Sequence, residues 1–204
     1  MKRYLALGDS YTIGEAVEES ERWPMRLSAL IRSGGVPLAD PEIIAVTGWT
    51  TAELSAGIDA AAPQGPFDLV TLLIGVNDQY RGLEVDEYRT GFVALLERAI
   101  SLAGSRREAV LVLSIPDWGV TPFAAGRDRD SIAADIDRFN ALNRDETLRA
   151  GARYLDITPM TRTAGVTSDL LAPDGLHPSG VMYAEWARMA LPHALAALGA
   201  SDHL

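Results

Sequence analysis

The chain has 204 residues, of which 48% are hydrophobic, and 28 acidic against 18 basic side chains give it a formal net charge of −10. This charge disfavours binding to nucleic acids and to anionic membrane surfaces, because both carry dense negative charge. The chain contains no cysteine, which excludes disulfides, thiolate catalysis and cysteine-ligated metals.

We expect a single globular domain spanning residues 1–204, because a chain of this length can bury a large core without metals or disulfides. The apolar run Tyr4–Leu7 is too short for the h-region of a signal peptide. No stretch approaches the roughly 20 apolar residues of a membrane span. A cytoplasmic protein is therefore expected, with export of a longer precursor as the alternative.

Short apolar runs alternate with amphipathic segments, a pattern typical of an α/β fold with a parallel sheet. The middle runs are apolar on both faces, as expected for strands that helices cover on both sides. Ser131 is a suitable N-cap for one helix, and Pro192 should kink or break the last one. In chain order the predicted elements are strands at 3–7, 42–47 and 68–74, a helix at 84–104, a strand at 109–115, a helix at 131–150, a strand at 152–156 and a helix from Ser179.

Four polar segments directly follow predicted strands. Ser10 follows the first strand, Gly48 the second, Asn77 the third, and residues 174–177 follow the fifth after a longer loop. Ligands of open α/β sheets bind in the crevice outside the carboxyl ends of the strands. The topology therefore predicts that these four segments meet in one site.

Only one of the three histidines has the setting of a catalytic base. His203 is the penultimate residue, and His193 lies in the predicted last helix. His177 lies in a loop directly before that helix, with a carboxylate three residues earlier, at Asp174. The alternative is an exposed histidine in a turn that leads into a helix.

Acyl transfer needs a nucleophile, a base, a group that orients the base, and donors for an oxyanion. Gly175 permits a tight turn in which Asp174 reaches Nδ1 of His177, which leaves Nε2 to accept a proton from Ser10. The side chain of Asn77 and the backbone at Gly48 are candidate oxyanion donors. Individually, these residues also fit a helix cap, an Asn-Asp turn and a strand-end glycine.

Taken together, the motifs resemble those of the GDSL family of esterases and lipases, within the SGNH hydrolase superfamily. The four blocks stand in the family's order and span residues 8 to 178. They are Gly8-Asp9-Ser10-Tyr11-Thr12, Gly48-Trp49-Thr50, Gly75-Val76-Asn77-Asp78 and Asp174-Gly175-Leu176-His177-Pro178.

The resemblance implies a three-layer α/β/α sandwich with a five-stranded parallel, flavodoxin-like sheet. It also implies that Ser10 is the nucleophile, His177 the base and Asp174 its partner. The oxyanion hole would consist of the backbone N–H groups of Ser10 and Gly48 and the side chain of Asn77. No metal or organic cofactor is implied. Tyr11 stands where the eponymous motif has leucine, a departure expected to alter the pocket wall.

The expected reaction is hydrolysis of a small ester, with a short acyl or acetyl group, through an acyl-enzyme. An acyltransferase that uses the same serine is an alternative, as is a non-catalytic binding module on this fold. A further alternative is a metal-dependent phosphoesterase with Asp9, Asp78, Asp174 and His177 as ligands. We expect instead that Asp9 and Asp78 accept hydrogen bonds from loop backbone and hold the motif turns. The oligomeric state is not predicted.

Four aromatic residues lie on loops next to the motifs and are candidates for an apolar substrate pocket. Each of them could equally seal its loop onto the sheet. The 116–130 loop, with Gly119 and Gly126 as hinges, is a candidate for a partial lid. The four aromatic residues are Trp49, Tyr80, Trp118 and Phe123.

Overall fold

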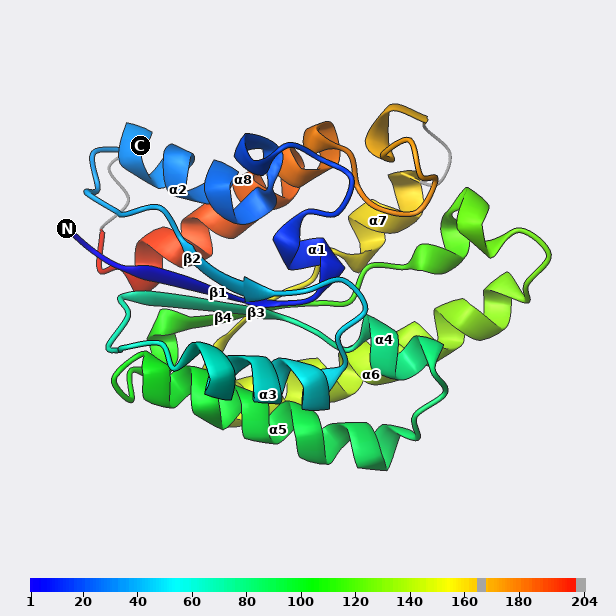
Figure 1. Ribbon diagram of the computed structural model, residues 1–204, viewed down its shortest axis with the longest axis horizontal. Coiled ribbons are helices and arrows are strands. Elements are labelled where there is room, and N and C mark those ends of the chain that lie inside the picture. Colours follow the sequence, from blue (N-terminus) through cyan, green and yellow to red (C-terminus); the bar gives the residue numbers. More distant parts are fainter. Residues whose placement is uncertain (165–167, 201–204) are drawn as a thin grey trace.

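A five-stranded parallel sheet lies at the centre of the molecule (Figure 1), in the spatial order β2-β1-β3-β4-β5. The computed structural model describes residues 1–164 and 168–200. All five predicted strands are confirmed within two residues of their expected ends. Their bounds are β1 (Tyr4–Gly8), β2 (Glu42–Ala45), β3 (Leu69–Leu73), β4 (Val110–Leu113) and β5 (Arg153–Leu155).

Helices cover both faces of this sheet, which gives the expected three-layer α/β/α sandwich (Figure 1). One layer contains α1 (Ser10–Ile13), α2 (Trp23–Ser33), α7 (Thr158–Ala164) and α8 (Gly180–Ala197). The other contains α3 (Thr51–Ala61), α4 (Val76–Tyr80), α5 (Val85–Leu102) and α6 (Arg129–Arg149). Single 3-10 turns are η1 (Glu19–Glu21), η2 (Arg107–Ala109), η3 (Trp118–Val120), η4 (Pro122–Ala124) and η5 (Ser168–Leu170).

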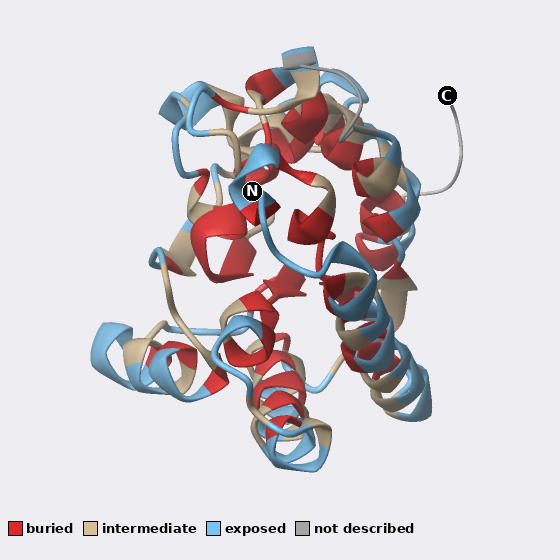
Figure 2. Ribbon diagram, turned by 90° about the vertical axis from the view of Figure 1, so that its right-hand side faces the viewer, coloured by how far each residue is buried: buried red, intermediate tan, exposed pale blue. Residues whose placement is uncertain are grey.

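Apolar side chains fill the two spaces between the layers, and the strands and inward helix faces are accordingly buried (Figure 2). Trp23 of α2 and Trp186 of α8 are fully buried on one side, as Tyr88 and Phe92 of α5 are on the other. Burial on both faces explains why the middle strands are continuously apolar. None of the described helices is long and apolar enough to cross a membrane.

The expected N-cap at Ser131 is wrong, and the last helix is not broken at Pro192. Asp128, and not Ser131, is the N-cap of α6, because its side chain accepts a hydrogen bond from the backbone N–H of Ser131 at 3.0 Å. Helix α8 runs through Pro192 without a break. The buried residues Ala190 and Ala194 lie on either side of this proline, so packing continues across it and offsets the lost hydrogen bond. The predicted cap of α8 at Ser179 is confirmed.

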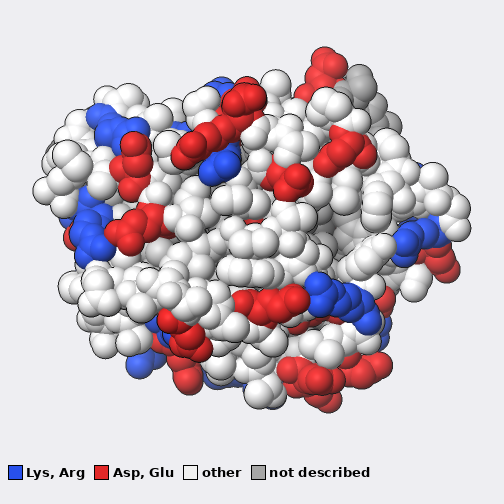
Figure 3. Space-filling view, viewed as in Figure 1, with Lys and Arg blue, Asp and Glu red and all other residues white. Residues whose placement is uncertain are grey.

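The strand order places a topological switch point between β1 and β3, because the chain leaves β1 toward β2 and later continues from β3 toward β4. Ligands of doubly wound sheets bind at this point, outside the carboxyl ends of the strands. Ser10 directly follows β1, and Asn77 follows β3. Acidic and basic side chains are interspersed on the face shown in Figure 3, and they form no broad basic patch there.

Candidate active site

Ser10 is the first residue of α1, immediately beyond the carboxyl end of β1. The side chain of Asp9 caps this short helix by accepting the Tyr11 N–H at 3.0 Å. Only glycine fits at position 8, because a Cβ there would lie 2.5 Å from the carbonyl oxygen of Leu73 and 2.2 Å from Oγ1 of Thr12. The tight strand-to-helix turn thus fixes Ser10, which is 5% exposed, at the switch point.

His177 and Asp174 belong to one turn before α8. Gly175 has a φ of 69°, and Oδ1 of Asp174 accepts the backbone N–H groups of Leu176 and His177, each at 2.9 Å. The other carboxylate oxygen, Oδ2, lies 2.7 Å from Nδ1 of His177. Partial burial opposes ionisation of Asp174, but these hydrogen bonds outweigh it and lower its pKa. The turn therefore orients the imidazole through a charged carboxylate.

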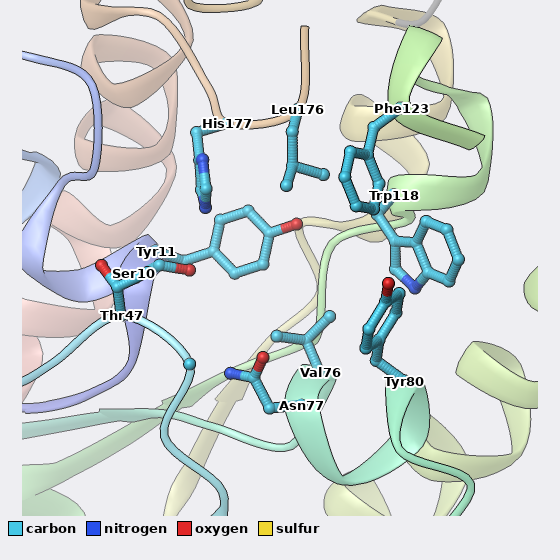
Figure 4. Close-up of a pocket in the computed structure, with 11 residues that line it drawn as sticks. Ser10, Tyr11, Thr47, Val76, Asn77, Tyr80, Trp118, Phe123, Leu176 and His177 are labelled. Carbon is cyan, nitrogen blue, oxygen red and sulfur yellow. The ribbon is translucent and has the colours of Figure 1, made fainter. Parts of the chain in front are cut away.

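One cavity of about 170 Å³ joins the four motif blocks. In Figure 4 the imidazole of His177 extends from one wall toward Ser10 on the facing side, and Asn77 comes from the wall below. His193 lies within α8 and does not line the cavity, whereas His203 falls outside the described residues. The lining residues are Ser10, Tyr11, Thr47, Gly48, Val76, Asn77, Tyr80, Trp118, Phe123, Leu176 and His177.

Three N–H donors are available at the Ser10 end of this cavity. The backbone N–H groups of Ser10 and Gly48 make no hydrogen bond to any other described residue. The side-chain amide of Asn77 donates to the backbone carbonyl of Trp49 at 2.9 Å. An amide nitrogen carries two hydrogens, so Asn77 retains one for a ligand.

The loop that carries Gly48 is held by side chains of the neighbouring Asn77 segment. Arg81, four residues after Asn77, donates to the Gly48 carbonyl at 2.7 Å and pairs with Glu53 of α3 at 3.4 Å. Together with the bond from Asn77 to Trp49, this contact fixes two successive peptide groups of the loop. The role of Arg81 was not predicted, although its i,i+4 spacing from Asn77 was a usable signal.

Asp9 and Asp78 hold motif turns, as expected. Asp78 is buried and accepts the backbone N–H of Thr51 at 3.0 Å and its hydroxyl at 2.7 Å, which ties α4 to the start of α3. Within residues 1–164 and 168–200, no three His, Cys, Asp or Glu side chains are grouped so that they could hold a metal ion. The geometry therefore does not favour the metal-dependent phosphoesterase.

Asp9 makes the stability of the protein depend on pH. Complete burial raises its pKa from 3.8 to about 8, against the effect of the Tyr11 N–H bond and with a contribution from the charge of Asp78. Between these two values the folded state holds a proton that the unfolded state has lost. The free energy of unfolding therefore falls as pH rises through this window, by roughly 1 kcal/mol per pH unit.

Asp9→Asn should remove this dependence, because asparagine keeps the capping oxygen and cannot ionise. Its free energy of unfolding relative to wild type should rise between pH 5 and pH 8, as measured by urea denaturation at several pH values. Parallel pH profiles for the two proteins would show that Asp9 does not hold a proton in the folded state.

Three of the four predicted pocket aromatics line the cavity, and Trp49 does not. The rings of Tyr80 and Trp118 lie 5.3 Å apart, and Phe123 lies 6.0 Å from Trp118. The indole of Trp49 instead covers Gly57 of α3, where a Cβ would come within 2.2 Å of the ring. Trp49 therefore seals its loop onto α3, which was the alternative considered for it.

The 116–130 loop forms a wall of the cavity and is tied down at several points. Trp118 donates to the side chain of Gln79 at 2.9 Å, and the Phe123 N–H donates to the Gly175 carbonyl at 3.2 Å. Gly119 is closely packed, since a Cβ there would lie 2.9 Å from both Asp117 and Ile132. These contacts fit a fixed wall better than a hinged lid.

The structure is a parallel α/β sheet with a cavity outside the carboxyl ends of its strands, where the four motif blocks meet. The chain belongs to the GDSL-like Lipase/Acylhydrolase family, whose sequence profile matches residues 6–185. This result confirms the resemblance seen in the four motif blocks, and the protein is an SGNH-type esterase. No curated protein sequence gives a significant match.

Solved structures share the fold at low sequence identity. TesA is 19% identical and superposes with a TM-score of 0.75, covering 97% of this chain and 100% of its own. An acetyl xylan esterase, AlAXEase, is 15% identical with a TM-score of 0.73 and coverages of 93% and 98%. The lipase/acylhydrolase from Enterococcus faecalis is 22% identical with a TM-score of 0.69 and a coverage of 94% for both chains.

Proposed function

We propose that the protein hydrolyses carboxylic esters with Ser10 as nucleophile, His177 as general base and Asp174 as the residue that orients His177. The carrying observation is the 2.7 Å contact between Nδ1 of His177 and the carboxylate of Asp174, on a ring that extends into the cavity toward Ser10. A histidine held in this way keeps Nε2 free to accept the serine proton.

In the proposed reaction, Oγ of Ser10 attacks the ester carbonyl carbon while Nε2 of His177 takes the hydroxyl proton. The tetrahedral oxyanion accepts hydrogen bonds from the N–H groups of Ser10 and Gly48 and from the Asn77 amide. His177 then gives the proton to the leaving alcohol as its bond to carbon breaks. A water molecule, deprotonated by His177, then attacks the acyl-enzyme, and His177 returns this proton to Oγ of Ser10 as its bond to the acyl carbon breaks and the acid leaves.

The substrate is proposed to be a small ester with a short acyl group, which accords with a cavity of about 170 Å³. One structural neighbour is an acetyl xylan esterase, whose name records cleavage of an acetyl ester. The cavity walls are mainly aromatic and aliphatic beyond the Ser10 end, through side chains such as Val76, Trp118 and Leu176. An acyltransferase reaction on the same serine remains the alternative, and faster transfer to an added alcohol than to water would identify it.

A p-nitrophenyl alkylphosphonate should inactivate the protein irreversibly, because its phosphorus accepts the activated serine and p-nitrophenolate leaves. We expect one phosphonyl group per chain, mapped to Ser10 by peptide mass spectrometry, with a rate of labelling that His177→Ala strongly reduces. Activity should be unchanged after incubation with EDTA. Labelling at another residue, or loss of activity in EDTA with recovery on adding a divalent metal, would contradict the proposal.

A further inference from the structure

Tyr11 places a polar atom within an otherwise apolar part of the cavity. Its side chain is 3% exposed and packs with its ring 5.6 Å from that of His177 and 6.1 Å from that of Trp186. In Figure 4 the phenol extends across the cavity from the Ser10 side, and its oxygen points toward the part lined by Trp118 and Leu176.

The phenol oxygen of Tyr11 has no hydrogen-bond partner among the residues that the structure describes. In the free protein, water in the cavity can satisfy it. A bound alkyl group would displace this water and leave the hydroxyl buried and unpaired, which is unfavourable. A bound group that carries an acceptor at this point would avoid that loss.

The charges around Tyr11 select the kind of acceptor. Burial raises the pKa of Tyr11 far above its ordinary value, and the carboxylates of Asp117 and Asp174 raise it further, so the phenol remains a hydrogen-bond donor. Arg162 pairs with Asp117 at 2.8 Å, so the charge of Asp174 is the one that disfavours a carboxylate or phosphate on the ligand. A neutral oxygen, as in an ether, a hydroxyl or a carbonyl, is the acceptor that fits.

We infer that Tyr11 is a specificity-determining residue that selects esters whose cavity-bound group carries a neutral oxygen acceptor. The inference rests on the proposed function, since it concerns the substrate of the same site. The oxygen can belong to the acyl group or to the alcohol group, and substrate pairs distinguish these two sources.

The test compares isosteric esters that differ by one oxygen in place of a methylene group, on wild type and Tyr11→Phe. Acyl pairs are p-nitrophenyl butyrate with methoxyacetate, and pentanoate with 3-methoxypropanoate. The alcohol pair is pentyl acetate with 2-ethoxyethyl acetate. For each pair we take the kcat/KM of the oxygen-containing ester divided by the kcat/KM of the alkyl ester. In at least one pair, Tyr11→Phe should lower this ratio by roughly 10-fold relative to wild type. Comparing the same two esters on two proteins cancels their intrinsic reactivity.

Tyr183→Phe is the matched control, because Tyr183 packs on the same Trp186 at 5.3 Å and also has an unpartnered hydroxyl, but that hydroxyl is sealed from the cavity. Its ratios should equal those of wild type. Equal ratios in wild type and Tyr11→Phe for every pair would overturn the inference while leaving the proposed function intact, as long as Ser10→Ala is inactive on all the esters. The p-nitrophenyl monoester of succinate carries a negatively charged carboxylate on its acyl group. If it were cleaved in preference to p-nitrophenyl butyrate, the restriction to neutral acceptors would be overturned.

Discussion

Ser10→Ala should lower kcat for p-nitrophenyl acetate by a factor on the order of 10⁴ to 10⁶, because it removes the only atom that forms the proposed acyl-enzyme. The fold should be retained, since the Ser10 hydroxyl makes no hydrogen bond to another residue in the described part of the chain. Steady-state kinetics measure the loss, and thermal unfolding followed by circular dichroism checks the fold.

Two further variants separate loss of the nucleophile from general damage. Ser101→Ala, in the exposed surface of α5, should keep wild-type kinetics. His177→Ala should be about as inactive as Ser10→Ala, and the double variant should be no worse than either, because a nucleophile and its base act as one unit. Normal hydrolysis by Ser10→Ala, or additive losses in the double variant, would contradict the assignment.

The sheet and the position of the site could be predicted because both follow from strong local signals. Five apolar runs are long enough to identify strands, and strands buried on both faces lack the alternation that would suggest another fold. Ser10, Gly48 and Asn77 each stand directly after one of these runs. Since parallel strands end at the same edge of the sheet, position in the chain already places such residues together.

The details that the sequence did not predict are of two kinds. Some depend on tertiary packing, and one depends on which of two nearby residues begins a helix. Asp128 and Ser131 are both good N-caps, and the pattern does not show which one the backbone uses. The effect of Pro192 depends on contacts along the whole of α8. Trp49 stands in a motif block, but the direction of its side chain toward Gly57 follows from the packing of its loop on α3.

The loop around Gly48 shows how the second and third motif blocks depend on each other. Asn77 and Arg81 both donate to carbonyl groups of this loop, at Trp49 and Gly48 respectively. Of the two residues, Asn77 lines the cavity and Arg81 does not. The Asn77 amide also has a second N–H that can donate a hydrogen bond to a ligand oxygen. The two side chains therefore share a structural role and differ in the proposed catalytic one.

Asn77→Ala should consequently lower kcat about 10² to 10³-fold with a much smaller change in KM, as expected for a donor that acts mainly on the oxyanion of the transition state. Arg81→Ala is the matched control, because it releases the loop and removes no donor from the cavity. The loss of kcat in Arg81→Ala should be at least about ten-fold smaller than in Asn77→Ala. Arg81→Ala only displaces the Gly48 N–H, whereas Asn77→Ala deletes a donor, and deletion is the more costly change by roughly this factor. Similar losses in the two variants would mean that Asn77 acts by holding the loop, and a change confined to KM would mean that it binds the substrate without stabilising the oxyanion.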